Sequence, residues 1–238
     1  GGAQGVAALA FGTRSIPPVE KIFGPGNRFV VEAKRQLFGT VAVDLLPGPS
    51  EIFIVADDSA NPAWLAADLL AQSEHGAGSI AVLVSPSRSL LEAVAAEVRT
   101  QLSTLQRRYA LSSALKNAQL VQVADLDAAL ELADRFAPEH LTLATQNPER
   151  LASRVRTAGA IFLGDLSPVV GGDFVVGPSH ELPTGGAGKS FGGLTVDQFQ
   201  RRTSLVRFDR KSLAASLPTI RTFSEVEGLD AHGRSASI

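Results

Sequence analysis

The stretch EIFIVADDSANPAWLAADLLAQSEHGAGSIAVLVS, residues 51–85, indicates the fold of the chain. It contains an apolar, β-branched strand at 51–56, a helix at 61–72 and a second such strand at 79–85. A strand, a helix and another strand in this order are typical of a βαβ unit, in which the two strands are parallel and the crossover is right-handed. The stretch therefore predicts an α/β protein.

The same alternation continues on both sides of this stretch. Further strands are predicted at 19–23, 39–45, 118–124, 140–144 and 159–164, and further helices at 26–38, 89–105, 126–136 and 148–158. Asp125 is expected to cap the helix that follows it, and Asn147 is expected to cap the next helix with Pro148 in its first turn. This order predicts an α/β fold of incomplete doubly wound, Rossmann-like parallel sheets.

The alternation ends after Gly164. Residues 171–193 read as a long loop rich in glycine and proline, and from Thr195 onward we expect helices around one strand at 203–208, which together form a small helical C-terminal appendage. The first residues show a helix-like apolar pattern without an initial Met, so the sequence reads as a piece that starts within a domain.

Composition excludes several classes of function. The 22 basic and 24 acidic side chains nearly cancel and form no block of one sign, so neither a nucleic acid nor a membrane surface is an expected partner. No apolar run approaches the roughly 20 residues that span a bilayer. The chain has no cysteine, which excludes disulfides, thiolate metal sites and a cysteine nucleophile. These features favour a cytoplasmic enzyme.

Two glycine-rich segments resemble nucleotide-binding motifs without completing them. PTGGAGKS (183–190) has proline where a phosphate-binding P-loop has its first glycine, and no buried strand precedes it. FGPGNRF (23–29) enters a helix after a strand but lacks the third glycine of a dinucleotide fingerprint. It nevertheless exposes backbone amides at a helix N-terminus.

Gln72 and His75 stand three residues apart at the end of the predicted 61–72 helix, which places both side chains on one face. An imidazole and an amide oxygen are acceptable ligands for zinc if other elements supply further nitrogen or oxygen donors. The alternative is that His75 only favours the helix C-terminus by its charge.

A second Glu-His pair, Glu139 and His140, follows Pro138 at the start of the predicted strand 140–144. Adjacent residues of a regular strand point to opposite faces, so both can serve one site only at an irregular strand entry. There they would supply two general bases of different pKa. A capped strand entrance with a surface glutamate is the alternative, and the residues alone leave both open.

The other two histidines also have acidic neighbours. His180 follows Asp173 within the 171–193 loop, and His232 follows Glu227 near the C-terminus. Because open α/β sheets form their sites at the carboxyl ends of the strands, we expect these polar groups to gather at that edge.

Six segments together resemble one family, the histidinol dehydrogenases. They are KIFGPGNRFVVEAKRQLFG (21–39), PGPSEIFIVAD (47–57), LLAQSEHG (69–76), APEHL (137–141), GAIFLGDLSPVVGGDFVVGPSHELPTGGAGKSFGGLTVDQFQRR (159–202) and GLDAHGRSASI (228–238). The resemblance covers essentially the whole chain, and it implies a further N-terminal portion before Gly1.

The resemblance implies a zinc-dependent homodimer that oxidises L-histidinol to L-histidine in two NAD-linked steps, the last reactions of histidine biosynthesis. The implied zinc ligands are Gln72, His75, Asp173 and His232. The implied acid–base pair is Glu139 and His140. The implied substrate-contacting residues are Ser50, Gln72, His75, His140, Asp173, His180, Glu227 and His232, and the implied NAD contacts are Gln4 and Asn27.

The resemblance also implies three parts of the chain. Residues 1–50 would end a Rossmann-like domain on the NAD side, 51–193 would form most of a Rossmann-like catalytic and zinc domain, and 194–238 would be a dimerisation appendage that carries His232 to the partner's site. Glu139 would activate water for addition to the aldehyde, while His140 would take the hydroxyl proton in each hydride step. Zinc would mainly orient the substrate.

Two alternatives to this function stay open. One is a zinc and NAD dehydrogenase of the same superfamily that acts on another small diol or amino alcohol, such as a sulfopropanediol. The other is that this chain is an inactive fragment, because a parallel sheet without its first strands exposes an apolar edge.

Overall fold

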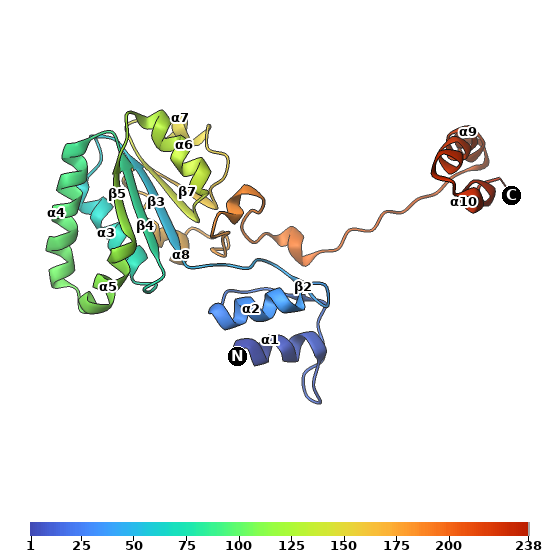
Figure 1. The fold of residues 1–238 in the computed structure, drawn as a ribbon, viewed down its shortest axis with the longest axis horizontal. Coiled ribbons are helices and arrows are strands. Elements are labelled where there is room, and N and C mark those ends of the chain that lie inside the picture. The colour runs from blue at the N-terminus through green and yellow to red at the C-terminus, as the bar shows by residue number, and fades with distance from the viewer. Residues whose placement is uncertain (238) are drawn as a thin grey trace. The chain divides into compact units, whose positions relative to one another are not determined.

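The computed structural model describes residues 1–237 and contains two parallel β-sheets (Figure 1). The larger sheet has the strand order β5-β4-β3-β6-β7. Its strands are β3 (Glu51–Ala56), β4 (Ile80–Ser85), β5 (Ala118–Gln122), β6 (His140–Ala144) and β7 (Ala160–Leu163), and the smaller sheet pairs β1 (Lys21–Ile22) with β2 (Ala42–Val43). The predicted α/β class with parallel sheets is confirmed.

Strand β3 is the point at which the larger sheet changes direction. The chain first adds β4 and β5 on one side of β3, and then returns to add β6 and β7 on the other side. Ile52 of β3 therefore pairs with Ala81 of β4 and with His140 of β6. This register brings the start of β6 beside the start of β3.

The helices agree with the predicted pattern in most of the chain. They are α1 (Gly2–Phe11), α2 (Arg28–Leu37), α3 (Pro62–Ser73), α4 (Arg88–Thr104), α5 (Arg108–Ala114), α6 (Leu126–Phe136), α7 (Pro148–Ala152), α8 (Val170–Phe174), α9 (Arg210–Glu227) and α10 (Asp230–Ser235), with short 3-10 helices at Leu115–Asn117, Ala187–Lys189 and Val196–Phe199. The Asp125 side chain caps α6 by accepting a hydrogen bond from the Ala128 amide, as predicted. Asn147 stands at the cap position of α7, but its side chain makes no capping hydrogen bond.

Helices cover both faces of the larger sheet at its central strand, β3. Ile52 and Ile54 point to the face covered by α3 and α4, whereas Phe53 and Val55 point to the face covered by α6 and α7 (Figure 1). Every residue of β3 is buried, including Glu51, which is 4% exposed. A strand covered on both faces must be apolar throughout, which explains the continuous run IFIVA.

Three predictions about the later part of the chain are wrong. Residues 203–208 form no strand, and Leu205 is 96% exposed. A strand needs a hydrogen-bonded ladder with a partner, and within residues 1–237 no strand pairs with this segment. The predicted 171–193 loop contains most of α8 and the short helix Ala187–Lys189. The predicted 148–158 helix ends early, at Ala152.

The chain divides into two compact units, Gly1–Gln198 and Phe199–Ile238. The second unit contains α9 packed against α10. Among residues 1–237, no helix combines the length and the apolar character needed to cross a membrane.

Candidate active site

Glu139 and His140 lie at an irregular strand entry, which is the arrangement that a shared site requires. Helix α6 ends at Phe136, and Ala137 then takes a left-handed conformation with φ of 56° before Pro138. His140 is the first residue of β6, and its Nδ1 lies 3.5 Å from Glu139 Oε2. The two side chains therefore lie side by side although they are adjacent in sequence.

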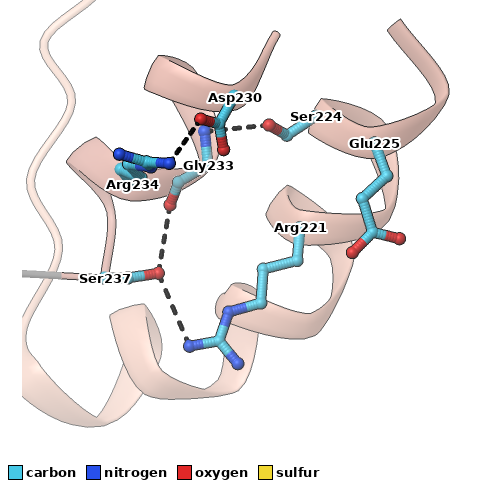
Figure 2. A pocket seen from close by; sticks show the side chains of 7 residues that line it. All are labelled: Arg221, Ser224, Glu225, Asp230, Gly233, Arg234 and Ser237. Carbon is cyan, nitrogen blue, oxygen red and sulfur yellow. Dashed lines mark hydrogen bonds and ion pairs between the residues drawn. The ribbon is translucent and has the colours of Figure 1, made fainter. Parts of the chain in front are cut away.

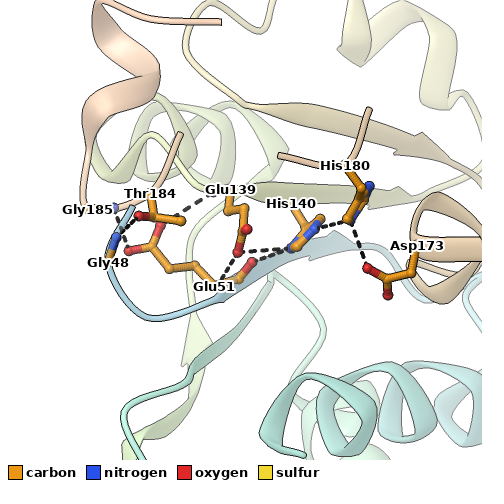
Figure 3. A network of polar contacts seen from close by, with 8 residues as sticks. All are labelled: Gly48, Glu51, Glu139, His140, Asp173, His180, Thr184 and Gly185. Atoms are coloured by element: carbon orange, nitrogen blue, oxygen red, sulfur yellow. Dashed lines mark hydrogen bonds and ion pairs between the residues drawn. The ribbon is translucent and has the colours of Figure 1, made fainter. Parts of the chain in front are cut away.

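The backbone of Glu51 holds both side chains of this pair. Its amide donates to Glu139 Oε2 at 2.8 Å, and its carbonyl oxygen lies 2.7 Å from His140 Nδ1 (Figure 3). A carbonyl oxygen only accepts, so His140 Nδ1 carries a proton and the neutral ring keeps its lone pair on Nε2. The register between β3 and β6 thus sets the tautomer of His140.

Burial shifts the pKa values of the pair in opposite directions. Glu139 is 8% exposed, and burial, reinforced by the charges of Glu51 and Asp173, raises its pKa to about 7. His140 is 3% exposed, and burial lowers its pKa to about 4, against the effect of its hydrogen bond to Glu51. The contact between Glu139 and His140 is therefore not an ion pair at neutral pH, because the imidazole is uncharged there. His140 can accept a proton, and Glu139 titrates near neutrality.

His180 and Asp173 complete a chain of contacts that begins at Glu139. His140 Nε2 lies 2.6 Å from His180 Nε2, and the two rings stack with their centroids 4.7 Å apart (Figure 3). His180 Nε2 also lies 3.4 Å from Asp173 Oδ1. Because His140 Nε2 is an acceptor in the neutral ring, His180 Nε2 is the donor in this contact.

Glycine at position 172 is necessary for this arrangement. A Cβ atom added to Gly172 would lie 2.4 Å from Cε1 of the His180 ring and 2.9 Å from the Phe162 ring. Helix α8 presents this glycine immediately before Asp173, so the imidazole can lie against the backbone of the helix.

The Glu51 side chain is a buried member of the site that sequence reasoning missed. Its Oε1 accepts from the Gly185 amide at 3.0 Å, and its Oε2 lies 3.4 Å from the Glu139 amide nitrogen (Figure 3). Burial raises its pKa. The sequence feature that could have indicated this role is an acidic residue at the start of an otherwise apolar strand. Gly185 belongs to the segment that resembles a P-loop, and its amide is occupied by this carboxylate.

The expected location of the site at the carboxyl ends of the strands is wrong. Glu51 and His140 are the first residues of β3 and β6, so the cluster lies at the amino edge of the larger sheet. In open α/β sheets, ligands usually bind in the crevice outside the carboxyl ends of the strands, which is the opposite edge. Here the end of α6 and the segment that carries His180 deliver the polar groups to the amino edge.

The predicted zinc ligands Gln72 and His75 lie at the end of α3, shortly before β4 begins. They therefore also lie toward the amino edge of the larger sheet. Helix α3 ends at Ser73, so His75 lies in the turn after it and is exposed. After burial, which is the main cause, a positive charge on His75 also lowers the pKa of His140. Gln72 is 3% exposed, and its Nε2 has no hydrogen-bond partner.

Two predicted site residues lie outside the larger unit. Glu227 and His232 belong to the second unit, and neither lines the cavity of about 200 Å³ between α9 and α10 (Figure 2). That cavity is bordered by the ion pair between Asp230 and Arg234, at 2.7 Å. Throughout residues 1–237, no three His, Asp or Glu side chains form a group that could hold a metal ion.

The predicted NAD contacts lie on the N-terminal helices, and Ser50 lies beside the cluster. Gln4 is an exposed residue of α1. Asn27 caps α2, where its side chain accepts from the amides of Phe29 and Val30. Ser50 directly precedes Glu51, and its carbonyl oxygen accepts from the Ile80 amide at 3.0 Å.

Parallel strands with helices on both faces define a Rossmann-like α/β fold. An acetylating aldehyde dehydrogenase from Geobacillus thermoglucosidasius matches 80% of this chain and 57% of its own at a TM-score of 0.51, with 16% identity, which shows a likeness of fold alone. The family model described as histidinol dehydrogenase matches residues 1–238, and the chain belongs to that family.

Relatives and a solved structure agree with this assignment. The chain is 49% identical over 239 residues to a histidinol dehydrogenase of Rhodopirellula baltica and 46% identical over 239 residues to one of Geobacillus kaustophilus. The crystal structure of histidinol dehydrogenase from Elizabethkingia anophelis matches all of this chain and 55% of its own, at a TM-score of 0.95 and 36% identity. The chain spans about half the length of these relatives, 52% and 56% of the two sequences.

Proposed function

We propose that this chain is the catalytic part of a cytoplasmic, zinc-requiring enzyme that oxidises L-histidinol to L-histidine through L-histidinal, with two NAD molecules as hydride acceptors. The observation that carries the proposal is the contact chain of Glu139, His140, His180 and Asp173. Glu139 and His140 are its buried members, and their carboxyl group and imidazole have exchanged their usual order of pKa. Membership of the histidinol dehydrogenase family supports the choice of substrate.

His140 would take the hydroxyl proton of the substrate in each oxidation step. Its Nδ1 is committed to the Glu51 carbonyl oxygen, so only Nε2 is available as a base. His180 now donates to that nitrogen at 2.6 Å, and the substrate hydroxyl would replace His180 there. As the hydroxyl proton moves to Nε2, the carbon that bears this hydroxyl would transfer a hydride to NAD. The substrate loses two electrons and NAD gains them, so the oxidation step balances.

Glu139 would activate the water that converts the aldehyde into its hydrate. Its pKa of about 7 leaves a substantial fraction ionised at neutral pH, yet the carboxylate is basic enough to accept a proton from water. The hydrate then has a hydroxyl whose proton His140 can take in the second step. None of these 238 residues is a cysteine, so none of them can hold the aldehyde through a thiol.

The proposed ligands Gln72, His75 and Asp173 have donor atoms of the kind that zinc accepts, although they come from more than one segment. Gln72 has a buried amide with an unpartnered nitrogen, His75 follows it in the next turn, and Asp173 faces the cluster from α8. An amide oxygen, imidazoles and a carboxylate form a nitrogen and oxygen donor set of the kind that zinc accepts. When bound, zinc would supply orientation of the substrate's imidazole and amine.

The fourth donor, His232, and the substrate contact Glu227 would come from the second unit of a partner subunit. The two residues belong to the compact unit 199–238, whereas the other three proposed ligands belong to the unit 1–198. This division supports the proposal of a homodimer in which each C-terminal unit completes the other subunit's site.

Asn27 and Gln4 would contact NAD from the N-terminal helices. Asn27 is the cap residue of α2 and therefore stands at the positive end of the helix dipole. The negatively charged pyrophosphate of NAD is suited to such a position.

The direct test uses protein of the relatives' full length. We expect NADH to form when NAD and L-histidinol are supplied, a chelator to remove the activity, and His140→Ala to abolish NADH formation while zinc stays bound. Turnover of another diol, such as a sulfopropanediol, without turnover of L-histidinol would contradict the proposed substrate.

A metal-binding measurement tests the zinc ligands separately from activity. We expect equilibrium dialysis to show that His75→Asn lowers zinc affinity, whereas Glu74→Gln, an exposed neighbour in the same turn, leaves it unchanged. Equal zinc binding by both variants would exclude His75 as a ligand.

A further inference from the structure

A buried cluster of three charged side chains lies outside the proposed acid–base pair. Lys34 of α2 is 1% exposed, and its Nζ contacts Asp44 Oδ1 at 2.5 Å and also donates to the Gly24 carbonyl oxygen. Asp44 is fully buried and accepts from the Gly24 amide at 2.7 Å. Glu181 Oε1 lies 3.9 Å from Lys34 Nζ, with 8% of its side chain exposed.

The cluster holds one more carboxyl group than its single cation can neutralise. Burial and the neighbouring Asp44 raise the pKa of Glu181 to about 7. Burial opposes ionisation of Asp44 too, but hydrogen bonds from Glu181 and Lys34 leave the pKa of Asp44 below its usual value. Near neutrality a substantial fraction of Glu181 is thus protonated, and the protonated carboxyl can donate to Asp44. Such a buried group adds little stability by itself, since desolvation offsets the attraction between the charges.

Glu181 connects this cluster directly to the candidate site. It follows His180 in the chain, and residues 175–184 form neither helix nor strand. Without a regular ladder of backbone hydrogen bonds, this segment depends on individual contacts for its position. The Glu181 side chain reaches the cluster on α2, while its carbonyl oxygen accepts from the Leu194 amide at 3.0 Å.

We propose that Lys34, Asp44 and Glu181 are positioning residues, which anchor the His180 segment to helix α2 and so hold the His180 imidazole against His140. The same helix carries Asn27 at its first turn and Lys34 two turns later. A shift of α2 when a ligand binds at Asn27 would therefore reach His180 through Lys34 and Glu181. The catalytic consequence of this role rests on the proposed function of His140, but the anchoring itself does not.

The test is the contact between the two imidazole rings in the 238-residue chain. With isotope-labelled histidine, the four ring signals can be assigned by single His→Gln variants, and a nuclear Overhauser cross-peak between the rings of His140 and His180 reports their stacking. We expect Glu181→Leu to lose this cross-peak. Glu181→Gln should retain it, because the amide can donate to Asp44 as the protonated carboxyl does.

A matched control removes a different carboxylate that binds a cation. Asp134 has a side chain that is 12% exposed and contacts Arg156 at 2.8 Å, far from His180 in sequence. Asp134→Leu should keep the cross-peak. A cross-peak of wild-type intensity in folded Glu181→Leu would overturn the proposal.

If Glu181→Leu does not fold, the contact can be removed by replacing Lys34 and Asp44, the partners of Glu181. The double variant Lys34→Met with Asp44→Leu removes both polar partners of Glu181 and is expected to lose the cross-peak, and its retention would equally overturn the proposal. At the relatives' full length, Glu181→Leu should lower kcat for histidinol while Glu181→Gln does not. Absence of turnover in the unmodified enzyme would refute the proposed function and leave the ring-contact result to decide the anchoring.

Discussion

Replacing Glu139 by glutamine should change how the stability of the protein depends on pH. Glu139 has a pKa of about 7 in the folded protein against an ordinary value of 4.5. Between these values the folded state binds a proton that the unfolded state has lost, so the stability contributed by the protonated side chain is full below pH 4.5 and is lost as the pH rises to about 7. At about 1.36 kcal/mol per pH unit, the loss amounts to about 3 kcal/mol.

His140 produces the opposite dependence in much of the same range. Its pKa falls from 6.5 to about 4 on folding, so the unfolded state binds the extra proton, and stability rises with pH between these values. The two effects largely cancel in the unmodified protein. The prediction therefore concerns the difference between the two proteins: the free energy of unfolding of Glu139→Gln should gain about 3 kcal/mol relative to the parent between pH 4.5 and about 7.

Urea unfolding across this range would measure the difference. Trp64 is the only tryptophan and lies on α3, so its fluorescence reports on the larger unit. Glutamine can still accept the hydrogen bond from the Glu51 amide, which limits other changes. Glu131→Gln makes the same chemical change at an exposed position and serves as the control. If the curves of Glu139→Gln and the parent run parallel across the range, burial does not raise the pKa of Glu139 and the reasoning fails.

Two further substitutions test the packing and the capping of the fold. Gly172→Ala should displace the His180 ring, because the added methyl group would lie 2.4 Å from Cε1, and the cross-peak between the two imidazoles should disappear; Gly192→Ala, whose methyl group would meet nothing within 4 Å, should keep it. Asp125→Ala should lower the free energy of unfolding by about 1 kcal/mol, since the α6 cap is lost. Asn147→Ala removes no capping hydrogen bond, so chemical denaturation should show almost no change, and equal losses in the two variants would contradict this account.

Much of the larger sheet could be predicted because its pattern is local. The run at 51–56 and the strand at 140–144 were placed within their observed bounds, as was the helix at 126–136 that Asp125 caps. The strand predicted at 203–208 failed for the opposite reason. Its apolar residues satisfy a local pattern, but a strand also needs a partner, and within residues 1–237 no strand pairs with this segment.

The sequence predicted which residues form the candidate site better than it predicted how they are arranged. The sequence identified Glu139 and His140 as a pair, and it left open whether their side chains meet. The structure brings them together through the backbone of Glu51, 88 residues away from Glu139 in the chain. The same contact explains why the Glu51 side chain was missed, since its burial depends on strands β3 and β6 lying side by side.

The sequence by itself determined the α/β class, the order along the chain of the strands in the larger sheet, the Asp125 cap and the polar residues available for chemistry, because these depend on neighbours along the chain. Only the tertiary structure decided that the site lies at the amino edge of the sheet, that His180 stacks on His140, and that Lys34 reaches Glu181. It also decided the pKa values of Glu139 and His140. Desolvation and charge proximity set those values, and both arise from packing between segments that are distant in sequence.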